Sequence, residues 1–216
     1  MALGKAPGKV ILVGEHFVVH GTPAIALPLL SRGVRVEVVR EPGPWSMPDA
    51  VAAHVRRVLP LLDESPEALR VTVDSDLPIG AGLGGSAALA VALVRALDDA
   101  GVLTAEDVRL RAHELEKVAH GTPSGVDDAV AAYACPVHYI KGAVPAPMTG
   151  VAVPRLWVGL TADRTSTIEA VAGVGRLSES RPEWFADLRS KASAIAAEAQ
   201  AGLRTSGWGV VGDAMT

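Results

Sequence analysis

Cysteine is almost absent from this chain, since Cys135 is the only one in 216 residues. One thiol excludes an internal disulfide and a metal site built from several cysteines, and it favours a reducing, cytosolic setting. Long apolar runs are missing too. The longest clean stretch, 87–94, is far shorter than the about 20 residues that a membrane-spanning helix needs. The first residues do not have the pattern of a signal peptide, so we expect a cytoplasmic protein without a membrane segment.

A surplus of either charge is also lacking. The chain has 20 Lys and Arg against 24 Asp and Glu, a formal net charge of −4, which argues against the broad basic face of a nucleic-acid binder. Its 49% of hydrophobic residues is enough for a sizeable core. The histidine pairs His16/His20 and His113/His120 suggest zinc at first sight. However, His113-Glu114 is not followed by the second histidine that a zincin helix needs, so zinc is not expected.

The apolar patterns alternate irregularly between period 2 and helical spacing, which predicts an α+β or mixed α/β fold. Strands are expected at 9–13, 17–19, 24–27, 34–40, 69–74, 137–140 and 156–160. Helices are expected at 49–62, 87–100, 105–118, 120–132, 167–177 and 182–203. Thr104 and Asp107 form an N-cap pair for the third of these helices. The last helix carries one apolar stripe, made of Trp184, Leu188, Ala192, Ile195 and Ala199.

The strongest local signal is the segment from Gly80 to Ser86, which contains four glycines and lies between an expected strand and an expected helix. Glycines let the backbone approach a ligand closely, and the helix that follows points its free N–H groups and its positive dipole end at that ligand. An anion, most simply a phosphate, is the natural guest. The alternative is a tight strand-to-helix turn that binds nothing.

Two better-known phosphate motifs fit this sequence poorly. Gly80-x-Gly82-x-x-Gly85 satisfies the dinucleotide fingerprint, but that fingerprint needs an acidic residue at the end of a second strand, whereas Asp98 and Asp99 end a helix. A P-loop fails because Val10 follows Gly8-Lys9, where a Ser or Thr is required.

Three other places have residues suited to catalysis. Lys9 starts the first expected strand, Glu116 lies late in a helix, and the turn at 123–128 brings Asp127 and Asp128 into the next helix. Taken singly, each has an ordinary interpretation: a solvated lysine, a surface glutamate and a capping aspartate.

Together, in this order and spacing, these segments resemble the GHMP kinases, a family of small-molecule phosphotransferases, and within it the mevalonate kinases. Residues 6–16 and 18–26 are similar to the opening of those enzymes, residues 78–88 to the family's nucleotide loop, and residues 120–127 to the catalytic segment. The resemblance covers the chain from about residue 4 to its end.

The resemblance implies a role for each matching residue. The backbone of Gly80, Gly82, Leu83, Gly84 and Gly85 would wrap the phosphates of ATP. Ser86, which ends this loop, and Glu116 match the magnesium ligands. Asp127 matches the catalytic base and Lys9 its basic partner. The positions that line the mevalonate pocket are matched by Glu15, His16, Ser124 and Thr167.

The resemblance therefore implies Mg²⁺-dependent transfer of the ATP γ-phosphate to the 5-hydroxyl of (R)-mevalonate in isoprenoid biosynthesis, and it suggests a homodimer that binds neither nucleic acid nor membrane. Two alternatives stay open: another GHMP small-molecule kinase, for phosphomevalonate or a sugar, and a catalytically silent nucleotide-binding relative. The family fold predicts a nucleotide- and substrate-binding domain over 1–150. Residues 151–216 would begin a ferredoxin-like C-terminal domain that is incomplete here.

The sequence also departs from the family pattern at two positions. Gly85 stands where many relatives have a serine. Asp128 follows Asp127 where relatives often have Asn or Thr, and a second carboxylate so close would raise the pKa of its neighbour.

Overall fold

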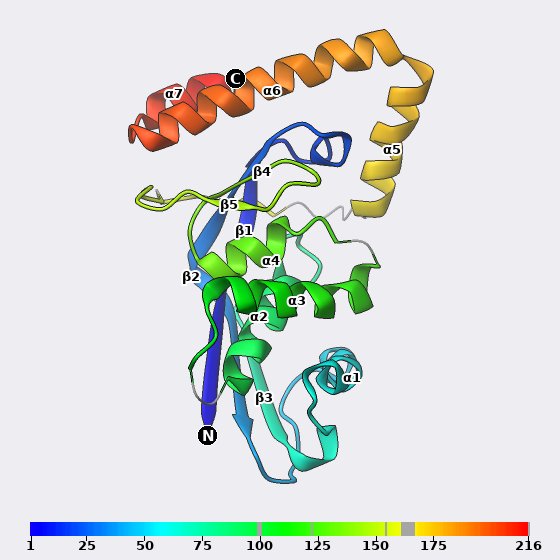
Figure 1. The fold of residues 1–216 in the computed structure, drawn as a ribbon, viewed down its shortest axis with the longest axis vertical. Helices are drawn as coiled ribbons and strands as arrows, with labels where there is room; N and C mark the ends of the chain where they lie inside the picture. The colour runs from blue at the N-terminus through cyan, green and yellow to red at the C-terminus, as the bar shows by residue number, and fades with distance from the viewer. Residues whose placement is uncertain (99–100, 122, 154, 161–166, 216) are drawn as a thin grey trace. The chain divides into compact units, whose positions relative to one another are not determined.

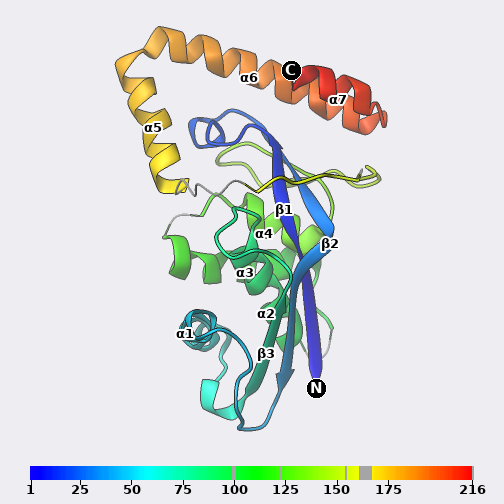
Figure 2. The ribbon, with the colours of Figure 1, turned by 180° about the vertical axis from the view of Figure 1, so that it is seen from behind.

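The computed structural model describes residues 1–98, 101–121, 123–153, 155–160 and 167–215, with the backbone alone at 167–171 (Figures 1 and 2). The strands are β1 (Ala2–Val13), β2 (Ala24–Val39), β3 (Arg70–Ser75), β4 (Val137–Tyr139) and β5 (Ala146–Pro147). The helices are α1 (Asp49–Val58), α2 (Gly85–Leu97), α3 (Ala105–His120), α4 (Val126–Tyr133), α5 (Thr167–Ser180), α6 (Pro182–Arg204) and α7 (Trp208–Ala214). The expected mixed α/β class is confirmed.

The strands form one sheet in the order β1–β2–β4–β5, with β3 also paired to β2. The β2–β3 pair is antiparallel and places Val36 opposite Val73 and Val38 opposite Val71. Alternation along β2 buries Val36 and Val38 and leaves Arg35 exposed, as period 2 requires of a strand with one face on the core.

The chain divides into two compact units, and β1 and β2 contribute residues to both. Unit 1 comprises Met1–Lys9 and Pro28–Ala134. Its central helix is α2, an alanine-rich helix that is buried over most of its length and packs against α3 and α4. Small side chains allow this close packing: a Cβ at Gly4 of β1 would lie 1.9 Å from the carbonyl oxygen of Ala92. Unit 1 therefore places β1, α3 and α4 around one helix.

Unit 2 comprises Val10–Leu27 and Cys135–Thr216. Its core gathers side chains from β2, the segment after β4, α6 and α7: Ile25, Leu27, Met148, Ala199, Leu203 and Val211. Helix α7 packs closely against α6 because Gly202 has no side chain, and a Cβ there would lie 2.9 Å from Cγ2 of Val211. Among the helices that the structure describes, none is both long and apolar enough to cross a bilayer.

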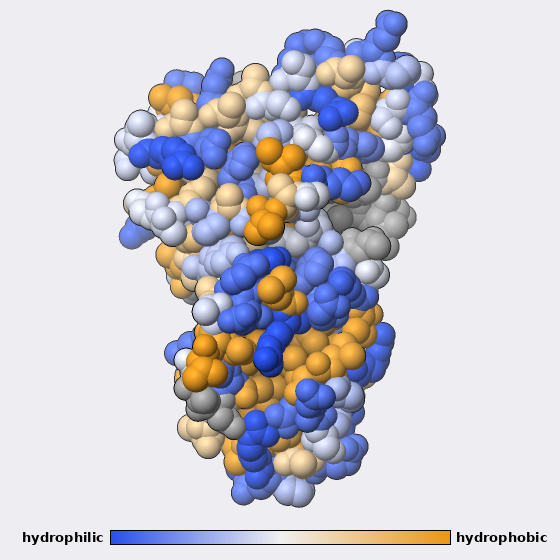
Figure 3. Space-filling model, viewed as in Figure 1, coloured by the Kyte–Doolittle hydropathy of each residue, from blue (hydrophilic) through white to orange (hydrophobic). Residues whose placement is uncertain are grey.

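The surface mixes polar and apolar residues. Figure 3 shows hydrophobic residues between hydrophilic ones, with hydrophobic residues gathered over part of unit 1. The exposed large hydrophobic side chains include Ile79 and Val102 in unit 1 and Val144 and Trp157 in unit 2. Scattered apolar side chains of this kind are common on soluble folds and do not by themselves mark a site.

The structure corrects several strand predictions. The expected strands at 24–27 and 34–40 are one strand, β2, which continues through Pro28. Residues 17–19 do not form a strand, because a 3₁₀ turn covers Val18–His20, and 156–160 has no regular structure. The two-residue strand β5 was missed.

Helix boundaries also differ from the predictions. Helix α1 ends at Val58 and continues as a 3₁₀ turn over Leu59–Leu62, α2 spans 85–97 rather than 87–100, and α7 was missed. The expected helix at 120–132 begins only at Val126, because α3 runs on to His120 and Gly125 adopts a left-handed conformation (φ 87°). In α6 the predicted apolar stripe is confirmed in part: Ala199 is buried and Leu188 and Ala192 are half-buried, whereas Trp184 and Ile195 are exposed. The other buried apolar side chains of α6 are Phe185, Ala196 and Leu203.

Candidate active site

Lys9 and Asp127 form an ion pair within unit 1. Lys9 lies on β1 with its side chain 8% exposed, and its Nζ is 3.3 Å from Oδ1 of Asp127. Asp127 stands in the first turn of α4 with its side chain 35% exposed, so its carboxylate is still open to solvent. The free N–H groups at this helix end favour the charged carboxylate. The pair therefore combines a fixed cation with an accessible anion.

The glycine loop runs directly into α2. Gly80, Gly82 and Gly84 have φ angles of 70°, 72° and 71°, in the left-handed region that favours glycine. A Cβ at Gly82 or Gly85 would meet nothing within 4 Å, so this part of the loop is open. The first N–H groups of α2 have no acceptor within their own helix. Open backbone beside a helix N-terminus fits an anionic phosphate group.

The same loop also holds Lys9 in place. The backbone N–H of Lys9 donates to the carbonyl oxygen of Leu83 at 2.9 Å. The stem of Lys9 passes so close to Gly84 that a Cβ at Gly84 would lie 2.7 Å from its Cγ. The loop therefore leaves open space beside Gly82 and Gly85, whereas Gly84 packs directly against the side chain of Lys9.

Ser86 and Glu116 meet across α2 and α3. The hydroxyl of Ser86 donates to Oε1 of Glu116 at 2.5 Å, and Glu116 is only 4% exposed. Burial raises the pKa of the Glu116 carboxyl, although the Ser86 hydrogen bond and nearby His120 oppose the shift. A hydroxyl and a carboxylate are hard oxygen donors of the kind that Mg²⁺ prefers.

Any metal ion here would need further ligands. The described residues contain no group of three or more His, Cys, Asp or Glu side chains that could hold a metal. Among the described residues, Ser86 and Glu116 would therefore be the side chains that hold an ion here, and phosphate oxygens and water would supply its other ligands.

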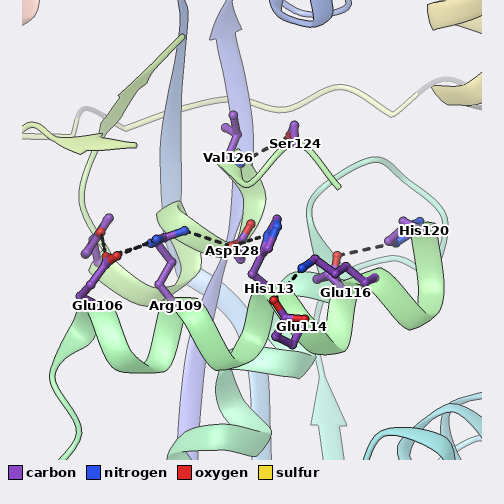
Figure 4. Close-up of polar contacts among 11 residues, drawn as sticks. Glu106, Arg109, His113, Glu114, Glu116, His120, Ser124, Val126 and Asp128 are labelled. Carbon is purple, nitrogen blue, oxygen red and sulfur yellow. Dashed lines mark hydrogen bonds and ion pairs between the residues drawn. The ribbon is translucent and has the colours of Figure 1, made fainter. Parts of the chain in front are cut away.

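Asp128 points away from the open side of the site. It is 1% exposed and faces Arg109 and His113 of α3 (Figure 4). Burial raises the pKa of its carboxyl, and the positive charge of Arg109 opposes the shift. From the sequence, Arg109 was not singled out and His113 was considered only as a zinc ligand, although their spacing along α3 is helical.

Comparison with known proteins places this chain in a family. Residues 49–135 match the family model described as GHMP kinases N terminal domain. A mevalonate kinase of Aeropyrum pernix is 34% identical to this chain, over 92% of the chain and 69% of the relative. The chain belongs to the GHMP kinase family.

Other relatives agree with this placement. A mevalonate kinase of Thermococcus gammatolerans is 34% identical over 84% of the chain. This GHMP kinase chain spans 64% of that relative's length. The crystal structure of L. major mevalonate kinase in complex with R-mevalonate superposes with a TM-score of 0.81 and 28% identity, covering 100% of this chain and 73% of that one.

The four residues expected to line the substrate pocket of this GHMP kinase lie in different places. Ser124 is in the turn before α4, where its hydroxyl accepts the N–H of Val126 at 3.4 Å. Glu15 and His16 belong to unit 2, in a turn where His16 has a positive φ of 63°. Thr167 is the first residue of α5, and its side chain lies outside the described residues. These four assignments stay predictions.

We expect Gly84→Ala to disturb the site more than Gly82→Ala does. Both substitutions place a side chain on left-handed backbone, at a cost of about 1–2 kcal/mol. Only the Cβ at position 84 would collide with Lys9. Gly84→Ala should therefore have the lower Tm of the two in calorimetry. Equal Tm values would show that the contact with Lys9 does not constrain the loop.

Proposed function

We propose that this GHMP kinase transfers the γ-phosphate of ATP to the 5-hydroxyl of (R)-mevalonate. The observation that carries the proposal is the Lys9–Asp127 pair, which stands beside an open glycine loop in a chain similar to mevalonate kinases. A base, a fixed cation and a phosphate cradle are what phosphoryl transfer to an alcohol requires.

Asp127 is the general base in this proposal. As the hydroxyl oxygen of the acceptor attacks the γ-phosphorus, its proton passes to the Asp127 carboxylate. The bond from the γ-phosphorus to the β–γ bridging oxygen breaks, and ADP leaves. The ammonium of Lys9 stabilises the negative charge that develops on the attacking oxygen.

The glycine loop and the Ser86–Glu116 pair hold the nucleotide in this proposal. The backbone at Gly80, Gly82, Leu83, Gly84 and Gly85 surrounds the phosphates, helped by the N-terminus of α2. Ser86 and Glu116 would hold Mg²⁺, and the chemistry that the ion would supply there is neutralisation of the phosphate charge.

The remaining assignments belong to the same proposal. Glu15, His16, Ser124 and Thr167 line the mevalonate pocket, and the chain acts in the cytoplasm as a homodimer. Residues 1–150 form the nucleotide- and substrate-binding domain, and residues 151–216 belong to the C-terminal domain.

The direct test is ADP release by the chain with Mg-ATP and one acceptor at a time. We expect release with mevalonate and none with galactose, homoserine or phosphomevalonate. Release with a different acceptor would assign the chain to another GHMP kinase activity. Binding of ATP without release in any of the mixtures would identify a silent nucleotide-binding relative.

A further inference from the structure

One face of α3 carries a regular stripe of charged and titratable side chains. Glu106, Arg109, His113, Glu116 and His120 follow one another at intervals of three and four residues, which places them on one side of a helix. Figure 4 shows them along the side of α3 that faces α4. The proposed metal ligand Glu116 is therefore a member of a longer row, and the function proposed above does not use the rest of that row.

The stripe holds α4 near its beginning. Oδ2 of Asp128, in the first turn of α4, is 3.2 Å from Nδ1 of His113 and 3.9 Å from Nη1 of Arg109. Asp128 is 1% exposed, and among these side chains Arg109 is the fixed positive charge that faces it, while His113 contributes a ring nitrogen. A buried carboxylate without such partners would be strongly destabilising.

The stripe also holds α4 at its end. The hydroxyl of Tyr133, the last residue of α4, donates to Oε2 of Glu106. Glu106 in turn accepts two hydrogen bonds from Arg109, at 2.8 Å and 2.6 Å. Those bonds lower the pKa of Glu106 to about 2, so the carboxylate stays charged at neutral pH. The eight-residue helix α4 therefore contacts α3 near both of its ends: through a hydrogen bond at Tyr133, and through ion-pair contacts at Asp128, whose Oδ2 accepts no hydrogen bond.

We propose that these contacts fasten α4 to α3 and thereby position the base. Asp127 and Asp128 are consecutive residues on one helical turn, so their side chains point about 100° apart. With Asp128 held against α3, the rotation of α4 about its axis is fixed, and Asp127 is directed at Lys9. Asp128, Arg109 and Tyr133 are then positioning residues, and the inference rests on the function proposed above.

A double-mutant cycle on kcat distinguishes positioning of Asp127 from a general stabilisation of the fold. We expect Asp128→Asn, which keeps the shape of the side chain, to lower kcat about tenfold and to leave KM for ATP unchanged. In an Asp127→Asn background the same substitution should lower the residual kcat no further, because the base it positions is already gone. An equal loss in both backgrounds, or no loss in either, would overturn the proposal.

A matched control lies on the same helix. Glu114 pairs with Lys117 on the exposed side of α3, with its side chain 62% exposed. Glu114→Gln should leave kcat and KM unchanged. A tenfold loss in this variant would show that any charge change on α3 lowers activity, and it would contradict a specific role for Asp128 and the side chains that face it.

Hydrogen exchange tests the fastening without an activity assay. Asp128→Asn and Tyr133→Phe should each speed exchange of the α4 backbone amides, while α2 amides stay protected and circular dichroism shows a folded chain. Unchanged exchange in α4 would overturn the proposal whatever the kinetics. If the wild-type chain does not phosphorylate mevalonate, the proposed function fails, whereas faster exchange in both variants would still support the fastening.

Discussion

Asp127→Asn is expected to lower kcat about 10³-fold while ATP still binds, because a general base contributes roughly 10²–10⁴ to the rate. The amide keeps the size of the carboxylate but cannot take the proton of the attacking hydroxyl. Asp127 lies 3.3 Å from Lys9 in the first turn of α4, and the proposed phosphate contacts come from the backbone of the glycine loop and not from Asp127. ATP affinity should therefore change little.

The measurement combines steady-state turnover with calorimetric titration of ATP. Asp187→Asn is a suitable control, since Asp187 is a half-exposed carboxylate that pairs with Lys191 on α6, and it should behave as wild type. Near-normal turnover of Asp127→Asn would show that another group takes the proton. Loss of ATP binding in this variant would place Asp127 in the nucleotide site.

Glu116→Gln is expected to change activity and stability in opposite directions. The variant loses the charge of a proposed metal ligand, so kcat at a fixed Mg²⁺ concentration should fall by roughly 10²-fold or more. Without Mg²⁺, the same variant should have the higher Tm at neutral pH. The amide oxygen of the new side chain can still accept the hydrogen bond from Ser86, while the buried negative charge is gone.

The gain in stability should depend on pH in a defined way. Burial raises the pKa of Glu116 above its unfolded value, so ionisation of this group costs folding free energy as the pH rises through the raised pKa. The difference in Tm between Glu116→Gln and wild type should be positive at neutral pH and shrink towards zero below about pH 4, where the carboxyl is protonated in both states.

Ser86→Ala provides the contrast for this experiment. It also removes a proposed metal ligand, but it takes away the hydroxyl that donates to the buried carboxylate and leaves that charge in place. Both variants should lose activity, and Ser86→Ala alone should lose stability at neutral pH. A lower Tm for Glu116→Gln at neutral pH would contradict the raised pKa.

Local sequence signals predicted the parts of the site that depend on backbone conformation. The glycines of 80–85 indicated a close approach of backbone to ligand, and the structure has left-handed backbone at Gly80, Gly82 and Gly84 and open space beside Gly82. The capping pair of Thr104 and Asp107 is present as a capping box. Such features are set by neighbouring residues and can therefore be predicted from short segments.

Features that depend on packing between distant segments could not be predicted in the same way. Phe185 is buried on α6, in place of the expected Trp184, because its ring stacks on that of Phe17, far earlier in the chain, at 5.6 Å between ring centroids. The orientation of the Asp128 side chain also could not be predicted from the sequence, because it depends on how α4 packs on α3. The helical spacing of four polar residues was the signal that could have predicted a polar face on α3 for Asp128 to meet. These residues are Glu106, Arg109, His113 and Glu116.

Transfer of the γ-phosphate of ATP to mevalonate, with Asp127 as the base, can be tested directly by identifying the phosphorus-containing products. The chain is incubated with Mg-ATP and (R)-mevalonate, and the products are identified by ³¹P nuclear magnetic resonance. We expect one new phosphomonoester, the 5-phosphate of mevalonate, formed in equal amount with ADP and about 10³-fold more slowly when Asp127→Asn replaces the wild type. Formation of ADP with free inorganic phosphate, or of the same ester by Asp127→Asn at the wild-type rate, would contradict this expectation.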